Sequence, residues 1–180
     1  GSFTAIPRST MCAYLEAAKP FLGKDGFAGI RISTRPDAIS AEILSLLRQY
    51  GVTAIELGAQ SMKDEVLLKN GRGHTAADVR RAAYQIKVHG FELGLQMMVG
   101  LPGDTEPEDA LYTAKALLAL SPDCMRIYPA VILPHTRLAE WYQMGKYVPM
   151  AFDTAVSVCA ELLLLFHQNR VPVIRLGLHD

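Results

Sequence analysis

The chain of 180 residues contains the stretch FELGLQMMVGLPG at residues 91–103. Its first nine residues, 91–99, predict a strand, and the glycines and proline of 100–103 predict the turn that ends it. One parity of the strand holds Leu93, Leu95 and Met97, and the other holds Gln96 and Met98. Because successive strand side chains point to opposite faces of a sheet, this strand has one apolar face and one polar face.

Strand-like and helix-like segments alternate along the rest of the chain. Ser40 and Thr75 are residue types that cap helix N-termini, and Gly51 and Gly90 are typical helix stops. The expected strands are 28–33, 52–58, 91–99, 124–129 and 171–176, and the expected helices are 8–22, 40–50, 63–69, 75–89, 106–120, 138–144 and 151–169. Strands separated by helices at this spacing predict a parallel sheet with crossover helices.

The division into an apolar and a polar face recurs on the neighbouring strands. The apolar parity holds Ile30, Ile32, Ile55, Leu57, Met125 and Ile127, and the polar parity holds Arg31, Ser33, Glu56, Gly58, Gln60, Arg126 and Tyr128. A flat sheet with helices on both faces would bury the polar row at a cost, whereas a barrel places it in a lumen that can hold a polar ligand. We therefore predict an α/β fold, a partial (β/α) TIM-type barrel of parallel strands with outer helices, with its site at the C-terminal strand ends. The alternative for Glu56 with Arg31 or Arg126 is a purely structural ion pair.

Composition and charge narrow the class of function. Eighteen Lys and Arg residues balance 18 Asp and Glu residues, and half of the chain is hydrophobic, which is typical of a globular protein. Zero net charge argues against a surface that binds nucleic acid non-specifically, but it is compatible with a local basic pocket. No run approaches the roughly 20 apolar residues that span a bilayer, and no signal-peptide pattern opens the chain. The three cysteines, Cys12, Cys124 and Cys159, have no disulfide or metal-ligand spacing. We expect a cytoplasmic protein without membrane contact.

Five short segments at the strand ends and in one loop carry a resemblance to a known family. They read STRPD at 33–37, ELGAQS at 56–61, NGRGHT at 70–75, MMVGLPGD at 97–104 and RIYP at 126–129. In this order and spacing they resemble the core of radical S-adenosylmethionine (SAM) enzymes, in particular the branch around the elongator catalytic subunit. The oxygen-independent coproporphyrinogen oxidases are cousins of that branch.

The resemblance implies that residues 1–180 form a single partial radical SAM barrel domain. Gly1, Ser2, Phe3 and Thr4 fit the tail of a glycine-rich turn in the family, so the first strand and its cluster loop would lie upstream. In that loop the family carries three cysteines, spaced three and two apart, that bind a [4Fe–4S] cluster. The three cysteines of this chain do not match the triad. We therefore expect the intact parent to bind the cluster, and the chain by itself to hold no metal and to be inactive.

The resemblance also implies contacts to the methionine part of SAM. Gly1 and Ser2 match the glycine turn, whose backbone meets the amino end of the cofactor. Ser33 occupies a position where relatives often carry a glutamate. Arg72 matches a cationic position that reaches the cofactor carboxylate, for which a planar guanidinium is well suited. The alternative for Arg72 is a loop arginine bonded to carbonyl groups.

For the adenosine part of SAM, the resemblance implies contacts from four further residues. Gln60 matches the position that meets the ribose hydroxyls, and an amide that both donates and accepts suits a vicinal diol. Gln96 matches a second ribose position, and the backbone of Ala130 and Val131 matches the adenine contact. No catalytic residue follows from the resemblance. His74 is expected to brace the glycine-rich loop, and an acidic cluster of Asp104, Glu106, Glu108 and Asp109 is expected to complement a helix dipole.

The resemblance implies a function for the intact parent: a radical SAM enzyme that binds a [4Fe–4S] cluster and SAM and generates a 5′-deoxyadenosyl radical. The elongator branch points to tRNA as substrate and to modification of its wobble uridine. One alternative is a small-molecule oxidoreductase similar to oxygen-independent coproporphyrinogen oxidase. A second alternative, from another class, is a non-catalytic domain that binds SAM or a nucleotide.

Overall fold

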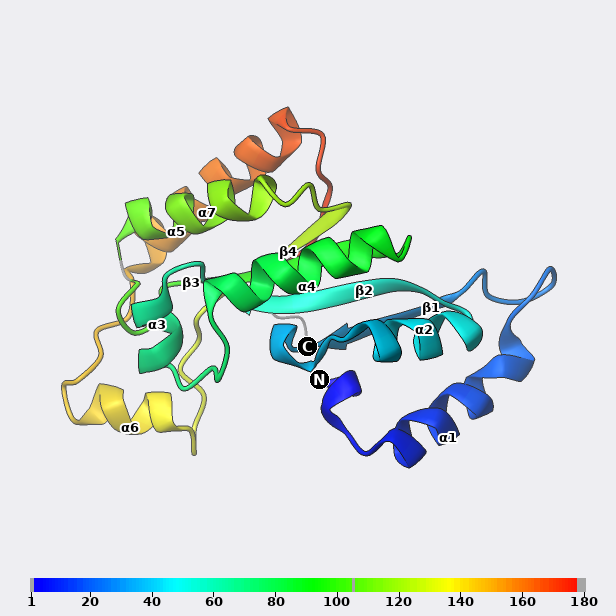
Figure 1. The fold of residues 1–180 in the computed structure, drawn as a ribbon. Coiled ribbons are helices and arrows are strands. Elements are labelled where there is room, and N and C mark those ends of the chain that lie inside the picture. Colours follow the sequence, from blue (N-terminus) through cyan, green and yellow to red (C-terminus); the bar gives the residue numbers. More distant parts are fainter. Residues whose placement is uncertain (1, 105, 178–180) are drawn as a thin grey trace.

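Five parallel strands form one sheet, and their order across the sheet is their order along the chain. The computed structural model describes residues 2–104 and 106–177. The strands are β1 (Ile30–Thr34), β2 (Val52–Gln60), β3 (Glu92–Val99), β4 (Cys124–Pro129) and β5 (Val173–Leu176). Each strand pairs in parallel with the next one in the chain, which confirms the predicted alternation of strands and helices (Figure 1).

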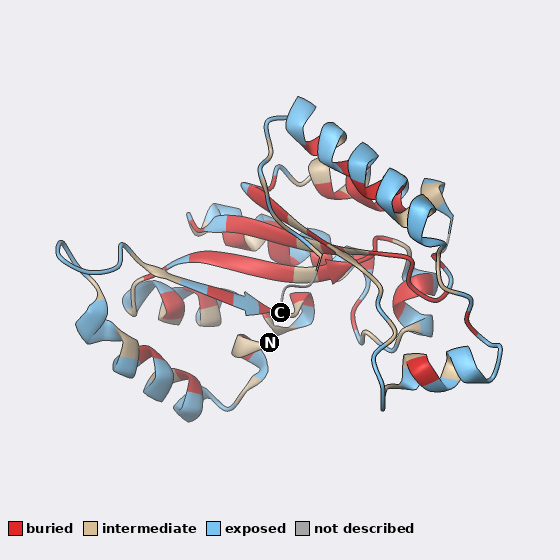
Figure 2. Ribbon diagram, turned by 180° about the vertical axis from the view of Figure 1, so that it is seen from behind, coloured by how far each residue is buried: buried red, intermediate tan, exposed pale blue. Residues whose placement is uncertain are grey.

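Seven helices accompany the sheet among the described residues. They are α1 (Arg8–Ala18), α2 (Ala41–Gln49), α3 (Asp64–Lys69), α4 (Ala76–Val88), α5 (Pro107–Leu118), α6 (Arg137–Gln143) and α7 (Phe152–Gln168), with short 3₁₀ turns at Phe3–Ala5, Lys19–Phe21 and Pro36–Ala38. Helices α2, α4, α5 and α7 cover one face of the sheet, and Figure 2 shows the strands in front of them when the molecule is seen from behind. Right-handed crossovers between neighbouring strands place successive helices on the same face. The predicted partial barrel is confirmed.

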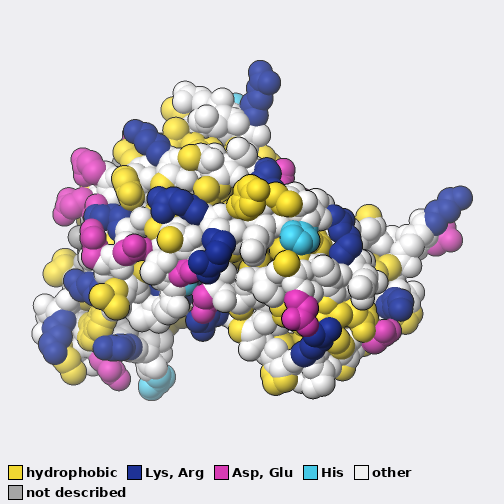
Figure 3. Space-filling model, in the orientation of Figure 1, with side chains coloured by type: hydrophobic (Ala, Val, Ile, Leu, Met, Phe, Trp, Pro, Cys, Tyr) yellow, Lys and Arg dark blue, Asp and Glu magenta, His cyan; other side chains and the backbone are white. Residues whose placement is uncertain are grey.

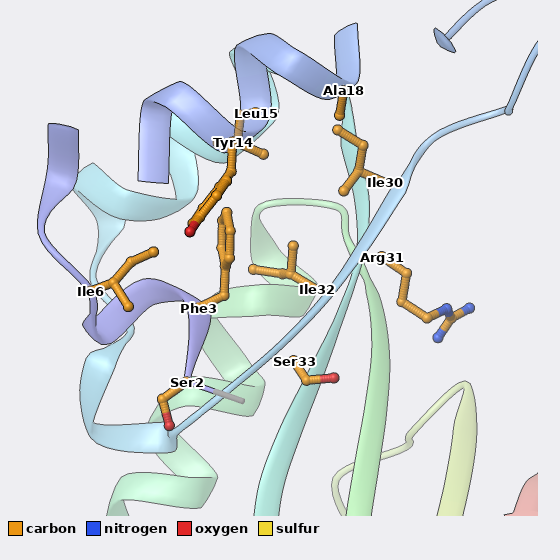
Figure 4. Close-up of a pocket in the computed structure, with 10 residues that line it drawn as sticks. All are labelled: Ser2, Phe3, Ile6, Tyr14, Leu15, Ala18, Ile30, Arg31, Ile32 and Ser33. Atoms are coloured by element: carbon orange, nitrogen blue, oxygen red, sulfur yellow. The ribbon is translucent and has the colours of Figure 1, made fainter. Parts of the chain in front are cut away.

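The apolar strand parity forms the core beneath these helices. Ile32, Ile55, Leu57, Leu93, Leu95, Met97, Met125 and Ile127 are all buried. Figure 4 shows the alternation on β1, where Ile30 and Ile32 point toward α1 while Arg31 and Ser33 point to the opposite side. Phe3, Tyr14 and Leu15 meet Ile30 and Ile32 around an apolar hollow of about 400 Å³.

Capping residues set the helix boundaries as the sequence predicts. The Ser40 hydroxyl accepts a hydrogen bond from the backbone N–H of Ile43, and Thr75 forms a reciprocal capping box with Asp78. Gly51 and Gly90 follow the ends of α2 and α4 with φ of +79° and +75°, a conformation that glycine adopts without steric cost.

One helix boundary and one strand boundary differ from the expected ones because of prolines. The helix expected over 8–22 ends at Ala18 and continues as a 3₁₀ turn that contains Pro20, because a proline within an α-helix removes a hydrogen bond and clashes with the preceding turn. The last strand, expected from residue 171, begins at Val173, directly after Pro172, because proline has no backbone N–H to donate to the neighbouring strand. Of the helices that the structure describes, none has the length and apolar content that crossing a membrane requires.

Candidate functional site

A polar pocket of about 520 Å³ lies along the carboxyl-terminal parts of β1 to β4. We call it the strand-end pocket. It is lined by Ser2, Ser33, Thr34, Arg35, Glu56, Gly58, Gln60, Arg72, Gln96, Met98, Arg126 and Tyr128. The polar parity of four strands therefore converges on one cavity, whose volume is in the range of small-molecule sites.

Gln60 enters this pocket from an irregular end of β2. The pairing of β2 with β3 shifts between Gly58 and Gln60, and Gln60 has a φ of +67°, which is uncommon for a residue with a side chain. The side chain is 3% exposed, and its Oε1 accepts a hydrogen bond from Gln96 Nε2 at 3.4 Å. A Cβ at position 58 would lie 2.7 Å from Gln60 Nε2. Glycine at that position therefore gives the Gln60 amide its space.

Arg72 brings an uncompensated positive charge to the pocket. Its Nε is buried, and no hydrogen-bond partner for it exists among the described residues. Burial and the charge of Arg35 both lower the pKa of the Arg72 guanidinium. The Arg35 guanidinium itself is engaged by Asp37, with Arg35 Nε 2.9 Å from Asp37 Oδ1. A desolvated guanidinium next to a second cation is a strong binder of an oxyanion.

Glu56 holds the floor of the pocket together. Its side chain is nearly inaccessible, and Arg126 contacts both of its oxygens, through Nη2 at 2.9 Å from Oε1 and through Nε at 2.9 Å from Oε2, the latter an ionic contact without hydrogen-bond angles. Arg31 Nη1 lies 3.4 Å from Oε1, and the Ser33 hydroxyl donates to Oε2 at 3.3 Å. A hydrogen bond to Tyr128 and the charge of Glu56 raise the pKa of Arg126. Because both oxygens of Glu56 are occupied, the structural ion pair is the better interpretation of Glu56.

A second pocket, of about 290 Å³, adjoins the first through Met98. We call it the Trp141 pocket; besides Trp141 and Met98 it is lined by Lys69, Asn70, Leu101, Pro102, Ala130, Val131, Thr136, Arg137 and Leu138. The Arg137 guanidinium lies over the Trp141 ring, 4.8 Å from its centroid. Sequence reasoning missed this wall, because Trp141 on a short helix carries no motif that distinguishes a pocket residue from a core residue.

The predicted SAM residues thus fall into three groups. Ser2, Ser33, Gln60, Arg72 and Gln96 line the strand-end pocket, and Ala130 and Val131 line the Trp141 pocket. Gly1 lies outside the described residues. His74, which was expected to brace the glycine-rich loop, contacts the end of β2, with Nε2 3.2 Å from the Ala59 carbonyl oxygen.

The environment of Asp104 differs from the one that the sequence predicts. It was expected in an acidic cluster at a helix start, but it precedes α5, its backbone N–H donates to the Leu101 carbonyl at 2.8 Å, and the residue is 1% exposed. Neither carboxylate oxygen has a hydrogen-bond partner in the described part of the chain. Burial, with the charge of Asp109 added, raises the pKa of Asp104 to about 7. Only Glu106, Glu108 and Asp109 lie at the start of α5.

The cysteines do not form a cluster site. Cys12 lies in α1, Cys124 begins β4 and Cys159 lies in α7, and burial raises the pKa of the Cys124 and Cys159 thiols. In residues 2–104 and 106–177 no three His, Cys, Asp or Glu side chains are grouped so that they could hold a metal ion. The donor set of the strand-end pocket, in contrast, fits a ligand with a carboxylate and vicinal hydroxyls. Over the face of the molecule in Figure 3, basic and acidic side chains are intermixed.

Comparison with known families gives two matches that cover most of the chain. The model described as the radical SAM superfamily matches residues 8–116, and the model of the Radical_SAM C-terminal domain matches residues 122–180.

Curated relatives match about three quarters of the chain. A tRNA uridine(34) acetyltransferase of Dehalococcoides mccartyi is 29% identical over 140 residues, which is 76% of this chain and 30% of the relative. The human Elongator complex protein 3 is 32% identical over 142 residues, which is 76% of this chain and 25% of the relative. The chain therefore spans less than a third of the length of these two relatives.

Solved structures share the fold. The archaeal Elp3 of Methanocaldococcus infernus, solved with an N-terminal deletion, superposes with a TM-score of 0.79 at 25% identity, over 90% of this chain and 42% of that one. Coproporphyrinogen III oxidase of Escherichia coli, described as a radical SAM enzyme, gives a TM-score of 0.75 at 20% identity, over 94% of this chain and 39% of that one. At that identity the second likeness supports the fold alone.

Proposed function

The chain belongs to the radical SAM superfamily, and on that premise we propose that its strand-end pocket binds SAM with its methionine carboxylate on Arg72. One observation carries this assignment: Arg72 lines a small-molecule cavity, and the described residues offer its buried Nε no hydrogen-bond partner. A carboxylate bound in the cavity would neutralise the charge of the Arg72 guanidinium.

The other predicted SAM residues support the same orientation of the cofactor. Gln60 and Gln96 are joined by a weak amide hydrogen bond of 3.4 Å, and each keeps donor and acceptor capacity for the ribose hydroxyls. The Ser33 hydroxyl proton is directed to Glu56, so its oxygen would accept from the cofactor amino group. The adenine would then lie across Met98, against the backbone of Ala130 and Val131 in the Trp141 pocket. Gly1 remains a predicted contact to the amino end.

The residues of this chain hold and orient the cofactor. The contacts of Glu56 with Arg31, Arg126 and Ser33 fix the floor of the pocket, so the ligand meets a preorganised wall. In a protein of this family that holds a [4Fe–4S] cluster, the cluster would supply the electron for reductive cleavage of SAM. The described residues do not fit that cluster, so we assign them only the binding of SAM.

For the whole protein we propose tRNA as substrate and modification of its wobble uridine, in the cytoplasm. The support is the similarity to relatives named for acetylation of tRNA uridine 34 and for the elongator complex. Deletion of the gene should change the wobble-uridine nucleosides in a mass-spectrometric profile, and an Arg72→Gln gene should fail to restore them. An unchanged profile after deletion would reject tRNA and favour a small-molecule substrate.

Calorimetric titration of the chain with SAM tests the binding site itself. We expect Arg72→Gln to weaken SAM binding tenfold or more, because a charge-assisted hydrogen bond contributes about 1.5–3 kcal/mol. The matched control is Arg80→Gln, which removes an exposed arginine of α4. Equal affinities of the Arg72→Gln and Arg80→Gln variants would remove Arg72 from the site, and no binding of SAM to the unchanged chain would reject the pocket assignment.

A further inference from the structure

The polar side of the sheet carries more positive than negative charge. Arg31, Arg35, Arg72, Arg126 and Arg175 belong to it or to the strand-end pocket, and the carboxylates that contact them are Asp37, Glu56 and Glu92. All three carboxylates are engaged: Asp37 by Arg35, Glu92 by Arg31, and Glu56 by Arg31 and Arg126. Two arginines, Arg72 and Arg175, therefore remain without a carboxylate within 4 Å in the described part of the chain.

Arg175 lies beside Arg126 on the neighbouring strand. The pairing of β4 with β5 shifts in register between Met125 and Arg126, and after this shift Arg126 and Arg175 are Cα partners. Partners on neighbouring parallel strands extend their side chains from the same face of the sheet. Arg126 is held by Glu56 and contacts the Tyr128 hydroxyl at 3.4 Å. Both carboxylate oxygens of Glu56 are already engaged by other side chains, so Glu56 cannot also pair with Arg175. The Nε of Arg175 is buried and has no hydrogen-bond partner among residues 2–104 and 106–177.

A buried guanidinium donor without a partner is costly unless a ligand meets it. SAM carries one carboxylate, which the proposed function assigns to Arg72. That leaves Arg175, which does not line the strand-end pocket but stands one strand beyond its Arg126 and Tyr128 wall. A ligand on Arg175 would therefore lie next to the cofactor rather than in its place.

We propose that Arg175, beside the ion-paired Arg126, binds an oxyanion of the second substrate. This inference rests on the proposed function, since it takes the strand-end pocket as the SAM site. The planar fork of a guanidinium suits phosphate and carboxylate alike, so the substrate class is one that carries either group near the carbon that reacts. Arg175 would hold and orient the substrate by direct contact.

Nuclear magnetic resonance of the arginine Nε–Hε groups tests the proposal directly. The ¹⁵N-labelled chain is titrated with inorganic phosphate, and separately with acetate, at constant ionic strength set with chloride. The Arg175 signal is assigned by its loss in Arg175→Lys. We expect it to shift with saturation for at least one of the two anions, while the signal of exposed Arg80 does not saturate.

Matched variants give the second readout. Arg175→Gln should lower the affinity of the chain for the anion that saturates the signal by about tenfold or more, whereas Arg80→Gln should leave that affinity unchanged. Circular dichroism shows whether both variants remain folded. If Arg175→Gln unfolds, the wild-type titration decides, because it needs no variant beyond the assignment of the signal.

The outcomes separate the two ligand sources and the two proposals. Saturation by phosphate alone supports a nucleotide or other phosphorylated substrate, and saturation by acetate supports a carboxylate substrate. A linear drift of the Arg175 signal with both anions, like that of Arg80, overturns the inference. A SAM titration of the same sample tests the cofactor site independently: no response of the Arg72 signal would reject the proposed function while leaving the Arg175 result intact.

Discussion

Asp104 is the residue whose environment departs furthest from the sequence expectation. Its pKa is about 7 in the folded chain, against a reference value of 3.8. The folded state therefore binds a proton that the unfolded state has lost, so this residue destabilises the fold as the pH rises from about 4 to 7, by an amount on the order of 4 kcal/mol.

Asp104→Asn should remove that dependence. We expect the variant to melt at a higher temperature than the wild type at pH 8, and the difference to shrink as the pH falls toward 5. Thermal melts followed by circular dichroism across this range measure it. Asp153→Asn, on the exposed start of α7, is the control and should leave the pH profile unchanged. A parallel shift of the Asp104→Asn curve at every pH would contradict the prediction.

Gly58 controls the site through the space it leaves. In Gly58→Ala the new Cβ would lie 2.7 Å from Gln60 Nε2, so the amide must move. We expect SAM affinity to fall about fivefold to tenfold, the equivalent of one lost hydrogen bond of about 1 kcal/mol, with a stability cost of about 1–3 kcal/mol. A 2′,3′-dideoxy analogue of SAM should bind the variant and the wild type equally. An equal loss for the analogue would show that the Gln60 amide does not contact the ribose.

Among the elements, α4 depends most visibly on its cap. Thr75 accepts from the Asp78 N–H at 3.2 Å, and its own N–H donates to Asp78 Oδ2 at 2.8 Å. Thr75→Ala should cost about 1 kcal/mol, or a fall of about 2–4 °C in Tm for a domain of this size. Thr75→Ser keeps the hydroxyl and should retain most of the stability. Equal melting temperatures of the Ala and Ser variants would mean that packing alone fixes the start of α4.

The elements were also the part of the molecule most open to sequence prediction. Period-two alternation and capping residues identified all five strands and the starts of α2 and α4, since these signals are local. The site was predictable in part: the strand parity brought Ser33, Glu56, Gln96 and Arg126 to one cavity.

What the sequence left out depends on tertiary packing. The left-handed conformation of Gln60 follows from a register shift between two strands, and no local pattern encodes it. The burial of Asp104 and the wall formed by Trp141 arise where distant segments meet. The SAM contacts came from the family resemblance and remain predictions for Gly1, Ser2, Ser33, Gln60, Arg72, Gln96, Ala130 and Val131.

On the scale of the whole molecule, the sheet of the described residues has two unpaired edges. In the described part of the chain β1 pairs only with β2, and β5 pairs only with β4. Unpaired edges are templates for pairing with another chain, so we expect the 180-residue chain to self-associate as its concentration rises, visible as an earlier elution in gel filtration.

A charge on the β5 edge should suppress that association. Ile174 is 48% exposed on β5, and Ile174→Lys places an ammonium group there. Val88→Lys, at a 63% exposed position of α4, is the matched control for added charge. Association that both variants reduce equally would locate it away from the β5 edge.

The sequential order of the five strands has a consequence for synthesis on the ribosome. Each of the strands β2 to β5 pairs with the strand translated just before it, so each of them meets an existing edge when it leaves the exit tunnel. Among the described strands, none pairs with a strand beyond its neighbours in the chain, as it would in a sheet whose strand order is shuffled. Growth can therefore follow translation from the amino end, one strand–helix unit at a time.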